Sequence, residues 1–424
     1  MDFSDSFNIS VEDIEIKKTG KFDRIWKITD GGGIDQSAII VDGKLYFGSA
    51  DWNFYCLDSA TGKELWRFRA NGMFIIASPL CIDNIIYIGN YDGNMYALEK
   101  DTGKLIWYFR TNDSIGTRAG HYKNKIYFGS KDGFIYCLDS LKGNLIWKSA
   151  TGEPIVSSPS FFKGKLYMGS FNGFFYCLDA ETGKEVWRLK AGAEIYNDSP
   201  FPIREGIIYI TSFDNYLYAV DTENGKILWR FKTGKYGIAG PCEIYNETIF
   251  QPSRDGILYA LTMEGHEKWR FRTNELGVIV SVTVREERIY FGSETRDFYC
   301  IDINGKEIWR LQTEGGIFCG KVPFHNGKLY FGSYDCHMYC VDAESGELLW
   351  RFASSVQKRN EYPPLTEGFE AVIKKSAETI DTIVSDDKYS SLNNAFNLSD
   401  YGEKSEYMTK SEYTNKSEYS ADFN

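Results

Sequence analysis

The stretch YIGNYDGNMYALEKDTGKLIW, residues 87–107, contains the pattern that decides the fold. It recurs as YMGSFNGFFYCLDAETGKEVW at residues 167–187, and its last tryptophan returns along the chain at steps of 41, 40, 40, 42, 40, 40 and 41 residues. A fixed period of this length indicates a repeat architecture in which each copy is one supersecondary unit. The tryptophans of the series are Trp66, Trp107, Trp147, Trp187, Trp229, Trp269, Trp309 and Trp350.

Other residues keep the phase of these tryptophans. A small residue stands two positions after the first aromatic of each unit, and we expect it to let a ring of the neighbouring sheet approach closely, as at Gly48, Gly89, Gly129 and Gly169. A glycine precedes each tryptophan by four residues, at Gly62, Gly103, Gly143, Gly183, Gly225, Gly265, Gly305 and Gly346. The first aromatics are Tyr46, Tyr87, Tyr127, Tyr167, Tyr209, Phe250, Tyr290 and Tyr330, and a tyrosine follows each nine residues later.

Each copy is predicted to form four short strands rich in β-branched and aromatic residues, with an Asp-Gly turn between the second and the third. A four-stranded sheet cannot bury both of its faces alone, whereas eight sheets stacked around an axis bury them against each other. We therefore predict an all-β, eight-bladed β-propeller of four-stranded antiparallel blades over residues 22–353, with the recurring Trp and Tyr packed between blades. The strands of the second copy are predicted at residues 75–82, 85–90, 94–99 and 104–110.

A ninth tryptophan, Trp26, lies in KFDRIWKIT ahead of the first full copy. This stretch has the pattern of an outer strand, and we expect it to dock beside the last blade. Trp26 and Trp350 both fit the outer position there. The sequence leaves open which one occupies it and whether that blade has five strands. Residues 1–21 form an N-terminal extension.

The pattern Y-x-G-S-x-D-G-x-x-Y-x-L-D-x-x-T-G-x-x-x-W resembles the pyrroloquinoline-quinone-like (PQQ-like) repeat. This repeat occurs in quinoprotein dehydrogenases and in non-catalytic scaffold propellers such as the lipoprotein of the outer-membrane assembly machinery. The quinoproteins typically carry adjacent cysteines, a secretory signal, and Glu, Asn and Asp ligands for Ca²⁺. The present sequence has no Cys-Cys pair and no assignable ligand set. The resemblance therefore implies the architecture, and we expect no cofactor, PQQ included.

Composition limits the classes of partner. The chain has 424 residues and a formal net charge of −11, and an acidic chain repels nucleic-acid phosphates and anionic lipid. Its first residues, MDFSDSFNISVEDIEIKK, lack a cationic start followed by an apolar core. No apolar run is long enough to span a membrane. We therefore expect a cytoplasmic monomer with reduced cysteines that binds neither nucleic acid nor membrane.

Three sets of residues were considered for chemistry, and no catalytic residue is predicted. Cys336, His337 and Cys340 form a C-H-x-x-C pattern, but two sulfurs that far apart on one strand cannot share a zinc ion. A small buried position after the second tyrosine explains Cys56, Cys137, Cys177, Cys300 and Cys340. Either turn formation or a cation-binding carboxylate ring explains Asp51, Asp92, Asp132, Asp214, Asp255 and Asp335.

The loops that lead into the inner strands share one face with the Asp turns. Aromatic side chains there either anchor a partner or pack as the rim of the core. They are Trp52, Met73, Phe74, Tyr91, Phe171, Tyr196, Phe213, Tyr236, Phe318 and Tyr334. The central channel is predicted to be lined by Arg118, His121, Asp198, Glu243 and Lys321, either around a ligand or around water. We predict a binding site that includes Trp52, Phe74, Arg118, Tyr196, Tyr236 and Phe318.

The repeat stops after Trp350. Residues 354–385 are predicted to be a linker and an amphipathic helix, because apolar residues recur there at helical spacing from Phe369 to Val384. Residues 386–424 are polar and are expected to be disordered.

This tail contains the consecutive hexapeptides SDYGEK, SEYMTK, SEYTNK and SEYSAD. Neither a helix nor a strand has a period of six residues. The tail is therefore either a substrate for modification, similar to the repeated core peptide of ribosomally made and modified peptides, or a polar low-complexity segment. The candidate modification sites are Tyr401, Tyr407, Tyr413 and Tyr419.

Together these observations predict a non-catalytic scaffold that docks a protein or peptide partner and presents its tail to a modifying enzyme. The alternative is a quinone- or small-ligand-binding propeller enzyme.

Overall fold

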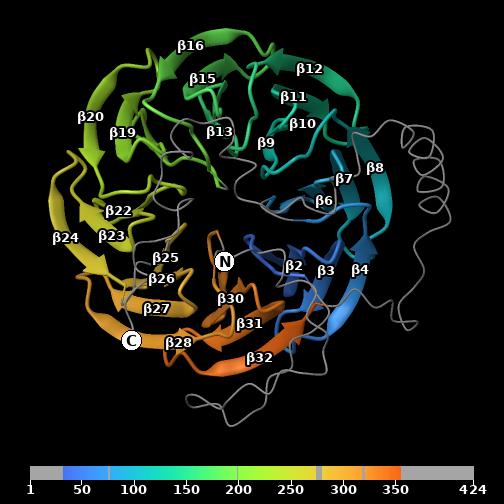
Figure 1. The fold of residues 1–424 in the computed structure, drawn as a ribbon. Helices are drawn as coiled ribbons and strands as arrows, with labels where there is room; N and C mark the ends of the chain where they lie inside the picture. The colour runs from blue at the N-terminus through green and yellow to red at the C-terminus, as the bar shows by residue number, and fades with distance from the viewer. Residues whose placement is uncertain (1–31, 75–76, 198, 274–278, 318–319, 355–424) are drawn as a thin grey trace, which may run out of the picture. The chain divides into compact units, whose positions relative to one another are not determined.

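The computed structural model describes residues 32–74, 77–197, 199–273, 279–317 and 320–354. Within these residues the chain forms eight antiparallel sheets of four strands each. The sheets surround a central axis as the blades of a propeller (Figure 1). The predicted eight-bladed all-β fold is therefore confirmed. Trp26, Asp198, Phe318, the helix predicted from Phe369 onward and the tyrosines of the hexapeptides lie outside the described residues.

Each blade takes its four strands in chain order from the axis to the rim. Blade one is β1 (Ile39–Val41), β2 (Lys44–Gly48), β3 (Asn53–Asp58) and β4 (Glu64–Arg69). Blade two is β5 (Leu80–Ile82), β6 (Ile85–Gly89), β7 (Asn94–Glu99) and β8 (Leu105–Arg110). Blade three is β9 (Gly120–Tyr122), β10 (Lys125–Gly129), β11 (Phe134–Asp139) and β12 (Leu145–Ala150). Blade four is β13 (Ser160–Phe162), β14 (Lys165–Gly169), β15 (Phe174–Asp179) and β16 (Glu185–Lys190).

The second half of the ring repeats this order. Blade five is β17 (Ile203–Arg204), β18 (Ile207–Thr211), β19 (Tyr216–Asp221) and β20 (Ile227–Lys232). Blade six is β21 (Glu243–Tyr245), β22 (Thr248–Pro252), β23 (Ile257–Leu261) and β24 (Glu267–Arg272). Blade seven is β25 (Thr283–Arg285), β26 (Arg288–Gly292), β27 (Asp297–Asp302) and β28 (Glu307–Gln312). Blade eight is β29 (Phe324–His325), β30 (Lys328–Gly332), β31 (His337–Asp342) and β32 (Leu348–Ala353).

The repeated aromatic residues form one row across each blade. In blade three, Tyr127 pairs with Cys137 and Cys137 pairs with Trp147, directly before a register shift. The residue between the two rings must be small, and Cys137 is fully buried there. Burial raises the pKa of its thiol to about 12. The cysteines of this row are thus neutral packing residues, as the alternation with alanine predicts.

The tryptophan of each outer strand packs on the next blade. A Cβ added to Gly143 would lie 2.6 Å from the Trp107 indole, so only glycine fits beneath the ring. The Trp107 Nε1–H donates to the Ser140 carbonyl at 3.1 Å, and the Tyr87 hydroxyl donates to the same oxygen at 3.0 Å. The other indoles make the equivalent bond to Lys100, Ala180, Thr222, Met263, Ile303, Ala343 and Ser59. The predicted packing of Trp between blades is confirmed.

The last of these contacts closes the ring. Trp350 on β32 packs on Gly62 of blade one and donates to the Ser59 carbonyl at 3.2 Å. Tyr330 donates to the same carbonyl at 3.1 Å. Trp350 therefore occupies the outer position that the sequence left open between it and Trp26.

A segment that we call the crossing segment leads from each outer strand to the inner strand of the next blade. Most crossing segments place an isoleucine on the glycine that ends the second strand, as Ile115 does on Gly89, where an added Cβ would lie 2.5 Å from the Ile115 side chain. The expected aromatic ring is found only against Gly48, where it belongs to Phe74. The expectation of a ring at Gly89, Gly129 and Gly169 is therefore wrong, because an isoleucine of the crossing segment packs on each of these glycines.

The inner strands are shorter than predicted. Strand β5 begins at Leu80, whereas the sequence predicted a strand from residue 75. Pro79 precedes it and has no N–H to donate to a ladder, so the chain before it crosses the face of the ring instead of pairing.

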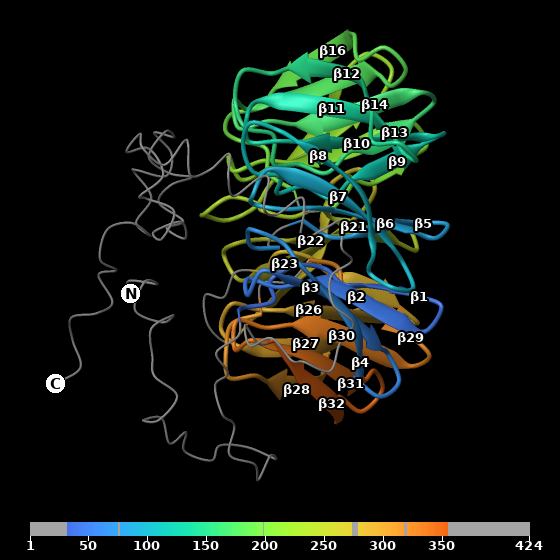
Figure 2. The same cartoon turned by 90° about the vertical axis from the view of Figure 1, so that its right-hand side faces the viewer.

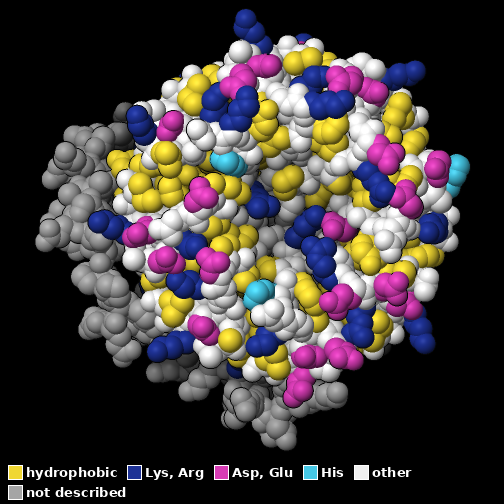
Figure 3. All heavy atoms as spheres, turned by 180° about the vertical axis from the view of Figure 1, so that it is seen from behind, with side chains coloured by type: hydrophobic (Ala, Val, Ile, Leu, Met, Phe, Trp, Pro, Cys, Tyr) yellow, Lys and Arg dark blue, Asp and Glu magenta, His cyan; other side chains and the backbone are white. Residues whose placement is uncertain are grey.

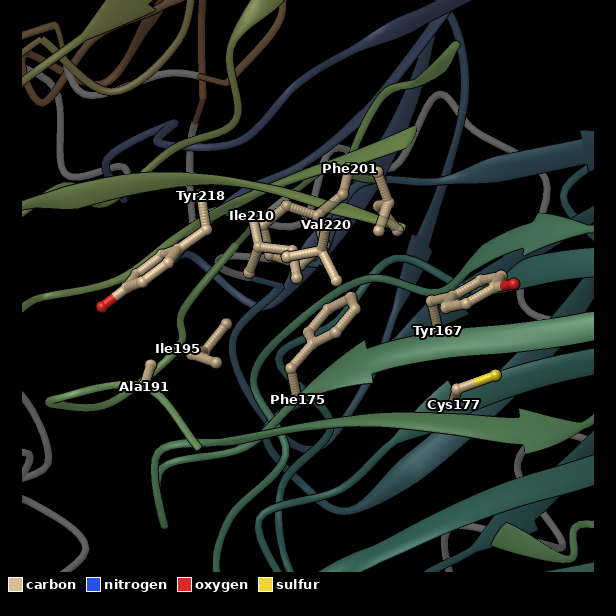
Figure 4. Close-up of a cluster of buried hydrophobic side chains, with 10 residues drawn as sticks. Tyr167, Phe175, Cys177, Ala191, Ile195, Phe201, Ile210, Tyr218 and Val220 are labelled. Atoms are coloured by element: carbon tan, nitrogen blue, oxygen red, sulfur yellow. The ribbon is translucent and has the colours of Figure 1, made fainter. Parts of the chain in front are cut away.

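The core lies between the blades. Figure 4 shows the cluster between blades four and five, where Phe175 of one blade faces Ile210 and Val220 of the next. The crossing segment contributes Ile195 and Phe201 to the same cluster. Residues of blade four, blade five and the crossing segment between them therefore form this interface together. No blade buries both of its faces by itself. Each blade therefore depends on its two neighbours, and the last blade must contact the first to close the ring.

The glycine beneath each indole can be tested by substitution. Gly143→Ala places a methyl group against Trp107 at a left-handed φ of 70°, whereas Gly43 has a similar φ of 71° and nothing within 4 Å of its added Cβ. The left-handed conformation costs both variants about 1–2 kcal/mol, and overpacking costs Gly143→Ala about 1–3 kcal/mol more. Denaturant unfolding should therefore show the larger loss for Gly143→Ala. Equal losses in the two variants would argue against the indole contact.

Candidate functional site

The two faces of the ring differ in their chemistry. One face, here the crossing face, carries the crossing segments and the turns between second and third strands. The opposite face carries the remaining turns, and the β5–β6 turn projects from it in Figure 2. Neighbouring blades are linked there by exposed ion pairs such as Lys44–Asp101 and Lys165–Glu223, both at 2.7 Å. Figure 3 shows this face, with basic and acidic side chains side by side around a central hollow.

The Asp turns of the crossing face are closed by a hydrogen bond to the second tyrosine of the repeat. In blade three the Asp132 carboxylate accepts the Phe134 N–H at 3.1 Å and the Tyr136 hydroxyl at 2.6 Å. Asn172 takes the same place in blade four, where its Oδ1 accepts the Phe174 N–H at 2.9 Å and its Nδ2 donates to the Tyr176 hydroxyl at 2.8 Å. The other pairs are Asp51–Tyr55, Asp92–Tyr96, Asp214–Tyr218, Asp255–Tyr259 and Asp335–Tyr339.

Both carboxylate oxygens are therefore used inside the turn. Among the described residues, no group of three or more His, Cys, Asp or Glu side chains is placed to hold a metal ion. The geometry favours the turn-forming explanation of these aspartates over a cation-binding ring.

Asp132 allows a direct test, because blade four uses asparagine in the same role. Asp132→Asn should keep both contacts, while Asp132→Ala leaves the Tyr136 hydroxyl and the Phe134 N–H without partners and should cost about 1–3 kcal/mol. Thermal unfolding with and without millimolar Ca²⁺ measures both effects. A rise in the melting temperature with Ca²⁺ that Asp132→Ala abolishes would support a cation site instead.

One residue per blade stands just before the aspartate of these turns, or before Asn172 in blade four and Thr295 in blade seven, and its chemistry varies while its neighbours repeat. Its backbone N–H bonds to the crossing segment, as in Lys131 to the Ser114 carbonyl at 2.9 Å and Phe213 to the Glu194 carbonyl at 3.0 Å. Ala50, Tyr91, Phe171, Arg254 and Tyr334 make the equivalent bond, so the backbone holds these seven residues in place. We call the whole set, one residue per blade, the turn ring: Ala50, Tyr91, Lys131, Phe171, Phe213, Arg254, Glu294 and Tyr334.

Cations and aromatic rings of adjacent blades meet in the turn ring. The Lys131 ammonium lies 4.4 Å from the centroid of the Tyr91 ring, and the Arg254 guanidinium carbon lies 5.2 Å from that of Phe213. The centroid of the Tyr196 ring lies 6.3 Å from that of Phe213. Such pairs contribute about 0.5–1 kcal/mol each at exposed sites. They also offer a partner both flat apolar surface and positive charge.

Glu294 places a carboxylate in the same ring. Burial raises the pKa of Glu294, and the nearby charge of Arg254 lowers it in part. A carboxyl whose pKa is raised by folding destabilises the folded state at neutral pH, and this cost disappears as the pH falls below the unfolded value.

Glu294→Gln should therefore be more stable than the wild type at pH 7.5. The difference should shrink as the pH is lowered towards about 4.3, the ordinary glutamate value. Denaturant midpoints measured across this range provide the check. A Glu294→Gln variant that is less stable at pH 7.5 would contradict the assignment.

The predicted binding residues are placed differently from one another. Trp52 is 42% exposed, and the Arg69 guanidinium carbon lies 5.6 Å from its ring. Arg118 is half-buried, and its backbone N–H donates to the Ser158 hydroxyl at 3.2 Å. Tyr196 and Tyr236 are also half-buried.

Phe74 belongs to the core and not to the predicted binding face. Its side chain is fully buried, and its ring centroid lies 5.7 Å from that of Phe54 and 6.4 Å from that of Phe68. It fills the place that isoleucine takes in other crossing segments, which the sequence alone did not reveal.

Trp52 also has a left-handed backbone. Its φ is 72°, at a turn position that holds Gly93, Gly133, Gly173 and Gly256 in four blades and Asn215, Arg296 and Cys336, also at positive φ, in the other three. A bulky residue there costs about 1–2 kcal/mol, and an exposed side chain returns little of that cost by packing. An observed strain of this kind points to a role other than folding.

The channel residues are only partly brought together. The Lys321 ammonium pairs with the Glu243 carboxylate at 2.5 Å, joining the crossing segment of blade eight to β21 of blade six past blade seven. His121 lies on β9, where burial lowers its pKa. The described structure places neither His121 nor Arg118 in that ion pair.

The C-H-x-x-C pattern does not lie on one strand. Cys336 has a φ of 68° and lies in the turn before β31, so the expectation that Cys336 and Cys340 lie on one strand is wrong. The His337 ring nitrogen Nδ1 lies 2.7 Å from the Asp335 carbonyl oxygen. This contact makes the His337 imidazole a structural part of the turn.

Sequence reasoning missed Lys131, Arg254 and Glu294, because only aromatic residues of these turns were considered. The signal was present: all three occupy the repeat position of Tyr91 and Phe213. Equivalent positions that vary between copies, while their neighbours repeat, could have been identified as one set of candidate binding residues.

A quinone centre of the quinoprotein type finds no matching donors among the described residues. The chain has no adjacent cysteines. The row cysteines Cys56, Cys137, Cys177, Cys300 and Cys340 each lie in a different blade. The carboxylates of the Asp turns are already bonded within their turns.

The sequence profile of one protein family matches the chain over residues 17–154, 131–241, 214–316, 254–358 and 296–387, and the family is described as outer membrane protein assembly factor BamB. No curated protein sequence matches the chain. None of the described residues forms a helix long and apolar enough to cross a membrane.

Solved structures share the fold at low sequence identity. The computationally designed Ika8 protein has a TM-score of 0.64 at 16% identity and covers 73% of this chain and 96% of its own. BamB from Moraxella catarrhalis has a TM-score of 0.63 at 19% identity, covering 71% and 94%. The quinohemoprotein alcohol dehydrogenase from Comamonas testosteroni has a TM-score of 0.61 at 13% identity, covering 80% and 76%.

Proposed function

Because the chain belongs to the PQQ-like repeat family described as outer membrane protein assembly factor BamB, we propose that it is a non-catalytic scaffold that binds a protein or peptide partner. The partner docks on the crossing face, against Trp52 and the turn ring. The observation that carries this proposal is Trp52, an exposed indole at a left-handed turn position that four other blades fill with glycine. Exposed tryptophans are among the residues that dominate binding energy at interfaces.

The chemistry of the turn ring supports a polypeptide partner. Tyr334 is 45% exposed and lies against the backbone of Gly33, which gives a flat apolar surface. Lys131 and Arg254 supply positive charge, each beside an aromatic ring, and Glu294 supplies one negative charge. Apolar surface with charges of both signs matches the side chains and carbonyls of a peptide segment.

The C-terminal hexapeptides extend this proposal. A partner held on the ring stays close to Tyr401, Tyr407, Tyr413 and Tyr419 through the chain itself, which raises its effective concentration at these tyrosines. An enzyme that modifies tyrosine repeats is the partner that best fits this arrangement.

The proposal is tested by comparing Trp52→Gly with Tyr108→Ala. Tyr108 is equally exposed, at 42%, but lies on β8 at the rim. Trp52→Gly relieves the left-handed strain, so its stability should equal or exceed that of the wild type. Proteins retained from a lysate of the source cells on each immobilised chain are then quantified by mass spectrometry. At least one protein should be retained by wild type and Tyr108→Ala and reduced by about tenfold or more with Trp52→Gly, as for an interface hot spot.

Identical retained proteins from all three chains would count against the crossing face. A chain ending at residue 365 separates the two parts of the proposal, because it should retain the partner while losing tyrosine modification. The quinoprotein alternative predicts instead that PQQ added with Ca²⁺ binds and changes its absorbance. Such a change would contradict the scaffold proposal.

A further inference from the structure

The outer strands of blades three and four carry exposed cations that lie over aromatic rings. In blade three the Lys148 ammonium lies 4.4 Å from the centroid of the Phe134 ring. In blade four the Arg188 guanidinium carbon and the Lys190 ammonium lie 4.9 and 4.7 Å from the centroid of the Phe174 ring. Each aromatic residue is the first of its third strand, a position that holds asparagine in blades one and two. The fold itself therefore does not require this arrangement.

Blade five repeats it. The Arg230 guanidinium carbon and the Lys232 ammonium lie 4.7 and 5.9 Å from the centroid of the Tyr216 ring. The three outer strands β12, β16 and β20 follow one another around the rim (Figure 1), and each ends where the chain enters a crossing segment. The cations therefore lie along one stretch of the rim, at the crossing face. We call them the cation arc: Lys148, Arg188, Lys190, Arg230 and Lys232.

Blades one, six and seven neutralise the equivalent cation with a glutamate of the same strand. In blade six the Glu267 carboxylate accepts two hydrogen bonds of 2.7 Å from the Arg270 guanidinium. Blades three and five have leucine and isoleucine at the position of this glutamate. Among the described residues, no carboxylate pairs with a cation of the arc except Glu185, whose Oε1 lies 3.6 Å from the Arg188 Nε. The arc therefore offers positive charge that the described ring does not neutralise.

Blade four also lacks the carboxylate of its turn, because Asn172 stands where six other blades have aspartate. In blade three the Tyr136 hydroxyl donates to Asp132 at 2.6 Å. In blade four the Tyr176 hydroxyl instead accepts a hydrogen bond from the Asn172 Nδ2 at 2.8 Å, so its own proton is not used within the turn. The Lys190 ammonium donates to the Asn172 carbonyl oxygen. A cation and a hydroxyl donor thus lie together at a turn without negative charge.

The outer strand of blade three places small side chains beside these groups. In blade two Phe109 packs on the next blade, and its ring centroid lies 5.7 Å from that of Tyr136. Blade three has Ser149 at this position, and Ala150 where blade two has arginine. Strand β12 faces Tyr176, because the tryptophan of β12 belongs to the same hydrophobic cluster. Blade three therefore brings a hydroxyl and no bulky side chain to the cations of blade four.

We propose that the cation arc binds an acidic polypeptide segment. The segment belongs to the partner that docks on the crossing face, so this assignment rests on the proposed function. Its carboxylates accept hydrogen bonds from Arg188, Lys190 and the Tyr176 hydroxyl in blade four. Arg230 and Lys232 bind the next carboxylate in blade five. Hydrogen bonds between ionised groups are stronger than neutral ones, so carboxylates suit these donors.

An acidic polypeptide fits the arc better than a single-stranded nucleic acid does. Proteins that hold single strands stack the bases on aromatic side chains. The rings of Phe134, Phe174 and Tyr216 are half-buried, and each already has a cation over it. A carboxylate needs only the cations, whereas a base would have to displace them from the rings.

Fluorescence anisotropy of a labelled octaglutamate peptide tests the arc on the full chain. The wild type should bind the peptide, and the affinity should fall as salt is added, because exposed charges are screened. Arg188→Gln with Lys190→Gln should weaken binding about fivefold or more. The matched control, Arg270→Gln with Arg272→Gln in blade six, removes the same charge at the equivalent positions and should change the affinity less than about twofold. Equal weakening by the two pairs, or no binding by the wild type, would overturn the proposal.

Asn172→Asp gives blade four the aspartate of the other blades. The midpoint of thermal unfolding should stay unchanged, because the new carboxylate accepts the Phe174 N–H and the Tyr176 hydroxyl as Asp132 does in blade three. Octaglutamate binding should weaken about twofold or more, because a negative charge is added beside Lys190. An unchanged affinity for the peptide would contradict the assignment of blade four to the site.

The peptide needs no cellular partner, so its binding is measured separately from the proposed function. Retention of a Trp52-dependent protein by a chain that does not bind octaglutamate would overturn the cation arc alone. Tighter binding of an oligothymidylate of the same length than of octaglutamate would show a nucleic-acid surface, which also overturns it.

Discussion

Every blade of this ring buries the indole of its outer strand on a glycine of the following blade and bonds the indole N–H to a carbonyl of that blade. The contact needs two residues in fixed phase, a tryptophan and a glycine with positive φ, and in six blades the first tyrosine donates to the same carbonyl. Because a four-stranded sheet has too little core of its own, this contact makes the ring stable only when it is closed. Closure depends on Trp350 meeting Ser59 and Gly62 across the two ends of the repeat.

The repeat determines the backbone, and function is left to the positions that vary within it. The turn ring shows this, since Lys131, Phe213 and Glu294 occupy equivalent places with unrelated chemistry. A designed protein, a BamB and a quinohemoprotein dehydrogenase share the fold, so the fold by itself assigns no activity. We therefore infer binding from individual side chains, Trp52 first among them.

The number of blades, the four strands of each and the packing of Trp107 and its equivalents followed from the period alone, because they depend on local pattern repeated eight times. The Phe74 and Gly89 contacts did not, since they involve crossing segments whose path is set by the next blade. The Lys321–Glu243 ion pair joins residues 78 apart, and the Ser354–Gly32 bond joins residues 322 apart. The period of the repeat does not predict contacts between residues this far apart in the chain. Cys336 was misplaced because its backbone enters the left-handed region, which sequence rarely reveals outside glycine and asparagine.

Hydrogen exchange of the indole N–H groups, followed by NMR on protein with ¹⁵N-labelled tryptophan, tests the central contact most directly. We predict slow exchange for the eight indoles that donate to carbonyls, from Trp66 to Trp350, and fast exchange for the exposed Trp52. Exchange of those eight indoles as fast as that of Trp52 would contradict it, because the blades would then not be joined by these bonds.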